Sequence, residues 1–318
     1  MKFTLRQLDA FVAVARQESV SRAAESLSLS QSAVSMSVNE LEKQFDTRLF
    51  DRYGKRLQLN ELGRQLLPRA QALLDQGQEI ENLLHGADDV GPLRLGATLT
   101  IGNYLAPLLL GQFMSGQPEQ QRRRVHLEVH NTAAIIRQVA NFELDFGLIE
   151  GVCQHPDLEV FPWVEDELAV FAGPEHPLAG QGKLSLKRLL QESWIVREPG
   201  SGTRQTLESA LGIHLAEMKI ALELEHTEAI KRAVEAGLGI GCISRLALKE
   251  AFRRGSLVEL PMPGLDLRRQ FHFIIHRQKF RTAGLQRFLE LCRQAVAGVE
   301  RSDQIVLRRA DGSVIDYR

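Results

Sequence analysis

The stretch "SQSAVSMSVNELEKQF", residues 30–45, has the spacing of a short helix but an unusual outer face. Ser30 stands in the position of a helix N-cap, and apolar residues then recur three and four positions apart. The opposite side begins with Gln31 and Ser32 and carries no charged residue before Glu40. An amphipathic helix usually presents charged side chains to water, so the neighbouring segments must explain this face. We predict that the inner face consists of Ala33, Val34, Val38 and Leu41.

Two shorter helical patterns precede this stretch and complete a three-helix unit. The first helix is predicted from the spacing of Leu5, Leu8, Phe11, Val12 and Ala15. The second follows a cap at Ser19 or Ser21 and carries Ala23, Ala24 and Leu27. Three short helices in the first 45 residues can bury a small core, and the second and third form a helix-turn-helix.

The next segment, "RLFDRYGKRLQLN" (48–60), predicts a β-hairpin, or wing. Apolar residues flank a Tyr-Gly turn on both sides, as they do in paired strands. The hairpin sets one acid, Asp51, against Arg48, Arg52, Lys55 and Arg56. A local basic cluster of this kind can bind a DNA backbone, although short wings are often basic without any such role.

A long helical pattern runs from Glu61 to about His85, followed by a polar linker that ends at Pro92. Apolar residues seven positions apart form a seam that needs a partner helix. Pro68 should kink this helix or mark its start. Ordinary core packing within one chain would give the same spacing over so short a helix. We nevertheless predict dimerisation through Leu66, Leu73, Ile80 and Leu84.

After the linker the pattern changes to alternating strands and helices, which predicts a parallel α/β sheet in two lobes. A late strand, "RQFHFIIHR", and a last amphipathic helix return the chain to the first lobe. Lobe I then comprises residues 91–165 plus 268–300, and lobe II comprises residues 166–267. The tail, residues 301–318, contains an Asp-Gly pair between alternating apolar residues, which is a hairpin signal.

Composition limits the class of protein. A net charge of −1 excludes binding of a polyanion by bulk charge, so any nucleic-acid surface must be local. Three distant cysteines indicate neither a disulfide framework nor a zinc finger, and a reducing compartment fits them best. The chain lacks the apolar core of a signal peptide and any apolar stretch long enough to cross a bilayer. We therefore expect a cytoplasmic protein that does not insert into a membrane.

Two segments at strand-to-helix junctions could bind an anion through backbone N–H groups and hydroxyls. They are "GATLTIGN" and "EPGSGTRQTLE", and they would line opposite walls of a cleft if the two lobes face each other. Hydroxyls and one arginine suit a small oxyanion or carboxylate, although the same residues could be plain helix caps. The predicted effector-binding residues are Thr98, Thr100, Ser201, Gly202, Thr203 and Arg204, with Glu150, His226 and Thr227 as weaker candidates. Of these, Thr227 is the one most readily interpreted as a plain cap.

Other constellations are interpreted as structural. His126 and His130 flank Glu128 along one strand, a spacing that could bind a metal, but they are expected on its solvent-exposed face. His272 and His276 receive the same interpretation. The chain contains no H-E-x-x-H, G-x-S-x-G or P-loop motif, so we predict no enzyme activity, no metal and no cofactor beyond the small anionic effector.

Over nearly its whole length the chain resembles the LysR-type transcriptional regulators. Residues 5–52 carry the most specific match, because the helix spacing, "SQSAVS", "LE" and "LFDR" all fall in register. Further matches are "LNELGRQLLPRA", "VREPGSGTR" and "AIKRAVEAGLGIGCIS". The resemblance implies a winged helix-turn-helix, a linker helix for dimerisation, and a two-lobed effector domain folded like a type 2 periplasmic binding protein. "GKRLQLNELGR", "GSGTR" and "HRQKF" are most similar to the branch of sulfur- and carbon-assimilation regulators.

The chain departs from this family at two places. Met36 follows Ser35 where relatives often carry an arginine, so we expect one polar DNA contact fewer. The tail is longer than is usual for the family. Amide and hydroxyl side chains suit base edges in the major groove, and the basic wing suits phosphates. The predicted DNA-binding residues are Gln31, Ser32, Ser35, Ser37, Arg22, Arg48, Arg52, Lys55 and Arg56.

The fold class is therefore α/β with an all-α N-terminal part. We expect a DNA-binding domain at 1–60, a dimerisation helix and hinge at 61–90, an effector-binding domain at 91–300, and an extension at 301–318. The expected partners are double-stranded promoter DNA, a small anion, further copies in a dimer or tetramer, and RNA polymerase. The competing interpretation is a small-molecule-processing α/β enzyme with an accessory helical domain, which turnover and a catalytic base in the cleft would distinguish. A binding protein without regulation would leave the wing unexplained.

Overall fold

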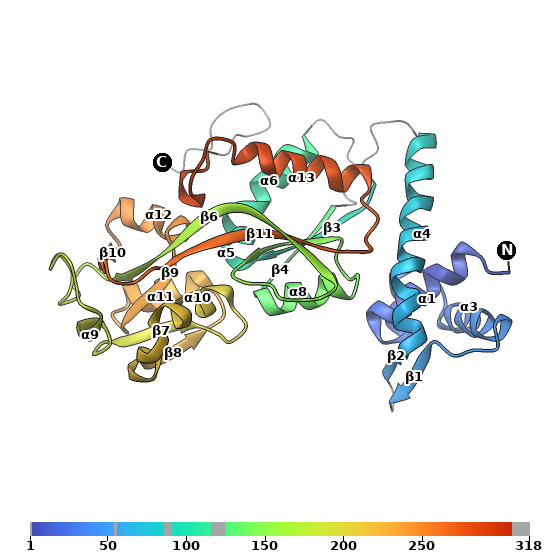
Figure 1. Ribbon diagram of the computed structural model, residues 1–318, viewed down its shortest axis with the longest axis horizontal. Helices are drawn as coiled ribbons and strands as arrows, with labels where there is room; N and C mark the ends of the chain where they lie inside the picture. The colour runs from blue at the N-terminus through green and yellow to red at the C-terminus, as the bar shows by residue number, and fades with distance from the viewer. Residues whose placement is uncertain (1, 54–55, 86–90, 116–124, 307–318) are drawn as a thin grey trace.

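The computed structural model describes residues 2–53, 56–85, 91–115 and 125–306 of the chain. Figure 1 shows a small helical unit at the N-terminus beside an elongated α/β body, with the long helix α4 (Glu61–His85) upright where the two meet. Among the helices of the described residues, none combines the length and apolar character needed to cross a membrane.

The N-terminal unit is the predicted helix-turn-helix with a wing. Its elements are α1 (Leu5–Gln17), α2 (Val20–Ser26), α3 (Gln31–Gln44), β1 (Phe50–Tyr53) and β2 (Arg56–Leu59). The Ser19 hydroxyl accepts a hydrogen bond from the Arg22 amide, so Ser19 rather than Ser21 caps α2, and Ser30 caps α3 as expected. The core of this unit completely buries Phe11, Val14, Ala23 and Val34.

The wing is an antiparallel pair of strands in which Phe50 lies opposite Leu59. The Phe50 and Phe11 rings lie 5.5 Å apart between centroids, so aromatic packing attaches the wing to α1. Of the basic residues predicted here, Lys55 lies outside the described residues. Arg52 and Arg56 are described only by their places in the two strands.

Helix α4 has one face in the N-terminal core and another exposed. Asn60 precedes it and accepts a hydrogen bond from the Gly63 amide at 2.8 Å, so the helix starts at its expected residue and Pro68 lies in its interior. A Cβ at Gly63 would lie 2.3 Å from the Leu49 carbonyl oxygen, which requires glycine at this crossing. The remainder of the helix carries the exposed residues Leu73, Ile80, Leu83 and Leu84.

The body is built on one nine-stranded sheet with the order β4-β3-β5-β11-β6-β9-β7-β8, with β10 paired to β6. The strands are β3 (Leu93–Thr98), β4 (Val125–His130), β5 (Phe146–Glu150), β6 (Leu158–Ala172), β7 (Ser193–Arg197), β8 (Lys219–Leu224), β9 (Ile240–Ser244), β10 (Val258–Glu259) and β11 (Arg268–His276). Strands β3, β4 and β5 run parallel in lobe I, and β7, β8 and β9 run parallel in lobe II.

The predicted parallel sheet has antiparallel strands at its centre. Strand β11 is antiparallel to both β5 and β6, and β6 is antiparallel to β9. Figure 1 shows β6 and β11 running side by side along the body, so two long strands join the lobes. The alternation of strands and helices along the chain describes each lobe separately and says nothing about the direction of the strands that connect them.

Helices cover both lobes. They are α5 (Leu99–Tyr104), α6 (Ala106–Met114), α8 (Thr132–Ala140), α9 (Leu186–Leu189), α10 (Gly202–Leu211), η1 (Gly212–Glu217), α11 (Thr227–Glu235), α12 (Arg245–Arg254) and α13 (Ala283–Ala295). The helix expected after "GATLTIGN" starts earlier, directly after β3, so Thr100 lies within α5 rather than before it. His126 and His130 lie on the exposed face of β4, 3.6 and 3.5 Å from the Glu128 carboxylate, as expected.

The first residues of the C-terminal extension pack against the strands that join the lobes. Ile305 is buried in the core of lobe I, and η2 (Ser302–Gln304) lies beside it. The Ser302 hydroxyl donates to Asp166 at 2.5 Å, and Arg301 pairs with Glu167 at 2.7 Å. The hairpin predicted around the Asp-Gly pair at 311–312 lies outside the described residues.

A charged joint connects the N-terminal unit to lobe I. The Lys279 ammonium lies 2.6 Å from Asp75 of α4 and 2.9 Å from Asp145, which also pairs with Arg94. Burial alone would raise the pKa of Asp145, but the positive charges of Lys279 and Arg94 outweigh it and hold that pKa far below its ordinary value. Lys279 therefore compensates two carboxylates from different parts of the fold.

Beside this joint, one histidine departs from expectation. His276 is buried, with its ring 4.1 Å between centroids from the Phe142 ring, which in turn packs into the N-terminal core. The solvent-exposed face predicted for His276 is therefore wrong. Burial lowers its pKa, which favours the neutral ring at this contact.

We predict that Lys279→Met lowers the free energy of unfolding at neutral pH by about 3 kcal/mol, because it leaves the partly buried Asp75 without its cation and the buried Asp145 with Arg94 alone. The folded-state pKa of Asp145 is depressed, so this stabilisation is present above the ordinary carboxyl pKa and is lost as pH falls toward the folded-state value. Urea denaturation at several pH values measures both effects. The exposed Lys187→Met is the control, and an equal effect of the two substitutions would contradict the joint.

Candidate functional site

The outer face of α3 is exposed and uncharged at its front. Gln31 and Ser32 are exposed, Ser35 and Ser37 are half-buried, and the inner residues Val34, Val38 and Leu41 are buried. Met36 is 60% exposed on the outer face. The inner face is therefore confirmed with the exception of Ala33, which is only partly buried.

A groove of about 560 Å³ joins α3 to the wing. Ser35 and Arg48 both line it, so the structure brings these two predicted DNA-binding residues together. Asn39 and Lys43, which sequence reasoning missed, line the same groove and extend the outer face by one and two turns. They could have been predicted from the sequence, because they lie four and eight residues after Ser35 on one helix and so share its face.

Arg22 lies on a different side of the N-terminal unit. Its guanidinium donates to the Gln17 carbonyl, and it lines a cavity of about 710 Å³ between α1, α2 and lobe I. That cavity also contains Arg94 and Glu128. The structure therefore does not bring Arg22 to the groove between α3 and the wing.

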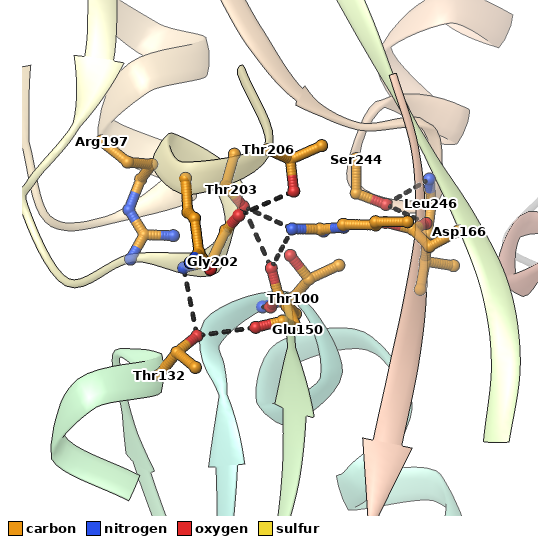
Figure 2. A network of polar contacts seen from close by, with 12 residues as sticks. Thr100, Thr132, Glu150, Asp166, Arg197, Gly202, Thr203, Thr206, Ser244 and Leu246 are labelled. Atoms are coloured by element: carbon orange, nitrogen blue, oxygen red, sulfur yellow. Dashed lines mark hydrogen bonds and ion pairs between the residues drawn. The ribbon is translucent and has the colours of Figure 1, made fainter. Parts of the chain in front are cut away.

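The second site lies between the lobes, where the predicted effector-binding residues meet around Glu150. Figure 2 shows Thr100 and Glu150 of lobe I facing Thr203 of lobe II. The Thr100 amide donates to Glu150 Oε1 at 2.8 Å, and the Thr203 hydroxyl donates to Glu150 Oε2 at 3.0 Å. The weaker candidate, Glu150, is thus the centre of the site, and the two stronger candidates bind it.

A second set of contacts holds the lobes together beside Glu150. The Thr132 hydroxyl donates to the Glu150 carbonyl at 2.9 Å and accepts from the Gly202 amide at 3.1 Å (Figure 2). A Cβ on Gly202 would lie 2.1 Å from the Glu150 carbonyl oxygen, so only glycine permits this approach. Ser201, the N-cap of α10, is 3% exposed, and its hydroxyl has no partner among the described residues. Thr98, the N-cap of α5, is also buried and makes no side-chain capping bond.

Arg269 of β11 joins this site to the strands between the lobes, and sequence reasoning missed it. Its Nη1 lies 2.8 Å from Glu150 Oε2 and donates to the Thr203 hydroxyl at 2.9 Å, while its Nε lies 2.7 Å from Asp166 of β6. The Ser244 hydroxyl donates to Asp166 from lobe II. A signal was available, because Arg269 shares one face of the strand with Phe271, Phe273 and Ile275, which are core residues.

Burial and charge act in opposite directions on the two carboxylates. Burial would raise the pKa of Glu150, but the charges of Arg269 and Arg197 and the hydrogen bond from the Thr100 amide outweigh it, so the pKa lies below its ordinary value. Burial raises the pKa of Asp166 in spite of Arg269 and two serine hydroxyls. Glu150 is therefore the carboxylate whose charged form this site stabilises.

Three other candidates lie outside this cluster. Arg204 donates to the Arg197 carbonyl at 2.9 Å and pairs with Glu208 and Glu223, so its charge is directed away from Glu150. His226 is exposed and occupies the N-cap of α11, without a side-chain capping bond. Thr227 is the first residue of the helix and is buried, so its interpretation as the cap is wrong.

Helix α11 nevertheless reaches lobe I. The Lys231 ammonium lies 2.7 Å from Glu228 and 3.4 Å from the Tyr104 hydroxyl of α5. Tyr104 also donates to Glu228. Helices α5 and α11 therefore make a second contact between the lobes.

Comparison with known proteins matches both parts of the chain to one family. The family described as "Bacterial regulatory helix-turn-helix protein, lysR family" matches residues 5–64, and the "LysR substrate binding domain" matches residues 86–297. The uncharacterized HTH-type transcriptional regulator YeiE of Escherichia coli is 44% identical over 292 residues, which cover 92% of this chain and 98% of that protein.

Solved structures have the same fold. A full-length OxyR variant from Pseudomonas aeruginosa superimposes with a TM-score of 0.68 at 22% identity, and the match covers 92% of this chain and 94% of that chain. The regulatory domain of CcmR from Synechocystis, in complex with 2-PG, gives a TM-score of 0.59 at 30% identity, and the match covers 67% of this chain and 100% of that chain.

We predict that Arg269→Met lowers the free energy of unfolding by about 3–5 kcal/mol, because Glu150 and Asp166 would remain buried without their cation. The adjacent Arg268→Met is the matched control. Arg268 pairs with Asp266 at the surface, where both side chains are 65% exposed, so its loss should change stability by no more than about 0.5 kcal/mol. Urea denaturation of both variants measures the difference, and equal stabilities would exclude a structural role for the Arg269 pairs.

Proposed function

Because the chain belongs to the LysR family of bacterial DNA-binding transcriptional regulators, we propose that a small anion bound in the cleft around Glu150 modulates DNA binding by α3 and the wing. The family regulates transcription, so the competing interpretation as an α/β enzyme is abandoned. The observation that carries the proposal is the convergence of Thr100, Thr203 and Arg269 on one buried carboxylate.

The DNA contacts are proposed for α3 and the groove beside it. Gln31 and Ser32 can donate and accept hydrogen bonds, as the base edges of the major groove require, and their short or neutral side chains allow close approach. Arg48 and Lys43 line the groove toward the wing and suit phosphates. We propose double-stranded promoter DNA as the target and, because bacterial DNA lies in the cytoplasm, a cytoplasmic location.

We expect Gln31→Ala to weaken binding to DNA upstream of the protein's own coding region about ten-fold, since one bidentate base contact is worth roughly 1–3 kcal/mol. Combined with Arg52→Ala, protection in footprinting should be lost. Gln44→Ala, at the other end of the same helix, is the control and should bind like the original protein. Footprints that survive the double substitution unchanged would refute the assignment of the reading face.

Self-association is proposed for the exposed side of α4. Leu73, Ile80 and Leu84 are 41%, 61% and 80% exposed, whereas Leu66 is partly buried in the subunit's own core and can contribute less. Leu83, at 74% exposure, belongs to the same exposed end. Two copies joined along this face would place two α3 helices on one side of DNA, about one helical turn apart. We propose that pairs of such dimers form the tetramer. We also propose that the DNA-bound protein contacts RNA polymerase.

Replacing Ile80 and Leu84 together by glutamate should convert the dimer to a monomer, because charged side chains cannot be buried in an apolar seam without a partner. Sedimentation velocity at micromolar concentration measures the change in mass. Glu61→Lys, near the other end of the helix, serves as a control for altered charge. A variant that remains a dimer would show that another surface carries the association.

The effector is proposed to be a small anion, a sulfur oxyanion or a small carboxylate. The support is chemical: an amide, a hydroxyl and a guanidinium from three elements converge at the place where two lobes meet. The CcmR regulatory domain, which is 30% identical, was solved in complex with 2-PG, which supports a small-molecule ligand for this domain. Effector and DNA should each alter the affinity for the other by the same factor.

In a thermal-shift panel of sulfate, sulfite, thiosulfate, phosphate and small dicarboxylates, at least one anion should raise the melting temperature. A ligand at a hundred times its Kd stabilises a protein by about 2.7 kcal/mol. Thr203→Ala should lose most of the shift because it removes a donor from the site. Thr206→Ala, one turn further along α10 and bonded to the Gly202 carbonyl, should keep it. A full shift of the melting temperature in the Thr203 variant would show that the effector binds elsewhere.

A further inference from the structure

The donors that converge where the lobes meet already bind an anion, and that anion is the side chain of Glu150. Its two carboxylate oxygens are used differently: Oε1 accepts from the Thr100 amide, and Oε2 accepts from the Thr203 hydroxyl and contacts Arg269. Glu150 is 1% exposed, so these bonds are shielded from water. The arrangement is that of a bound ligand, with the difference that the carboxylate belongs to the chain.

Charge leaves no room for a second anion beside this one. Arg269 is shared between Glu150 and Asp166, and the nearby Arg197 is paired with Glu198 at 2.8 Å. Another negative charge would place three anions around one guanidinium in a site removed from water, which is strongly unfavourable. An anionic effector can therefore enter only if the Glu150 carboxylate leaves the donors.

The geometry allows the side chain to leave while its backbone stays. Glu150 ends β5 and is paired across the sheet with Phe271, so the main chain is held. The seam in front of it consists of contacts between lobes: the Ala133 amide donates to the Gly200 carbonyl at 3.1 Å, and the Val152 amide donates to Gln205 at 3.3 Å. Separation of the lobes along this seam would break these bonds together with those between Thr132 and Gly202 and between Tyr104 and Glu228, and it would open a path for both the ligand and the departing carboxylate.

The donors also indicate which anion would replace it. Arg269 is 7% exposed, and its Nη2 has no partner among the described residues, whereas its Nη1 contacts Glu150 Oε2. The buried Ser201 hydroxyl is likewise unpartnered within the described part of the chain. An oxyanion with three or more oxygens can keep the bonds that Glu150 makes and supply an acceptor that Glu150 lacks.

We propose that Glu150 is an internal occupant of the anion position, and that a small oxyanion binds by displacing its carboxylate from Thr100, Thr203 and Arg269. This inference rests on the proposed function of the cleft and specifies how that site selects its ligand. The ligand-free protein is closed on its own carboxylate, so the effector exchanges one anion for another instead of filling an empty cleft.

Isothermal titration with sodium sulfate and sodium phosphate, at an ionic strength held constant with sodium chloride, tests the exchange. Glu150→Gln keeps the size of the side chain and removes its charge, so it should bind one of these oxyanions about ten-fold or more tightly than the original protein. If Glu150 contacted the ligand directly, the Glu150→Gln variant would bind the oxyanion with lower or unchanged affinity. Unchanged or weaker binding by Glu150→Gln would overturn the proposal.

Asp166→Asn is the matched control, because it removes the other carboxylate of the same guanidinium from outside the cleft. A gain in oxyanion affinity confined to Glu150→Gln supports displacement. An equal gain in both variants would show a general change of electrostatic potential and would overturn the proposal. Glu150→Ala should shift affinity in the same direction and serves in place of the glutamine variant if that variant fails to fold. If neither the original protein nor the folded Glu150 variants bind sulfate or phosphate, the exchange is overturned, while the other anions of the thermal-shift panel still decide the effector of the proposed function. Binding that weakens only in the Glu150 variants overturns the exchange and leaves the effector proposal intact.

Discussion

The buried guanidinium of Arg269 is the constraint on which the two-lobed body depends. It lies on one of the two strands that join the lobes and contacts a carboxylate on either side, Glu150 in the cleft and Asp166 on the neighbouring strand. Buried ions of this kind stabilise a fold only while every partner is present, since the loss of one leaves the others uncompensated. The relative position of the lobes and the contacts of Glu150 therefore both depend on the charge of Arg269.

Strand β11, paired with β5, also connects the cleft to the DNA-binding unit. Strand β5 has Asp145 just before its first residue and Glu150 at its last, and the neighbouring β11 has Arg269 near its start and is followed by Lys279. One ion pair, Glu150 with Arg269, thus lies at the cleft end, and another, Asp145 with Lys279, lies at the end that contacts α4. A physical connection through paired strands is what coupling between two such sites requires, and here both ends carry a buried charge.

Much of the N-terminal unit was predictable, because its structure follows from contacts between near neighbours in the chain. The caps at Ser19 and Ser30, the apolar spacing of α1 and α3, and the wing all depend on residues a few positions apart. The cleft was predicted only in part. Hydroxyl-bearing loops at strand ends indicated where the lobes would meet. Arg269 was overlooked although it shares a strand face with Phe271 and Phe273, and that spacing indicates a buried side chain without showing which distant carboxylates pair with it.

The sequence by itself determined the family, the order of the elements and the outer face of α3, because local spacing specifies each of these. Only the tertiary structure decided that Glu150 would occupy the cleft, that the two joining strands would be antiparallel to their neighbours, and that His276 would be buried. It also decided that Lys279 would meet Asp75, 204 positions earlier in the chain. Pairings of this kind arise when burial forces distant charges to find partners, and nothing in the spacing of either residue records which partner that will be.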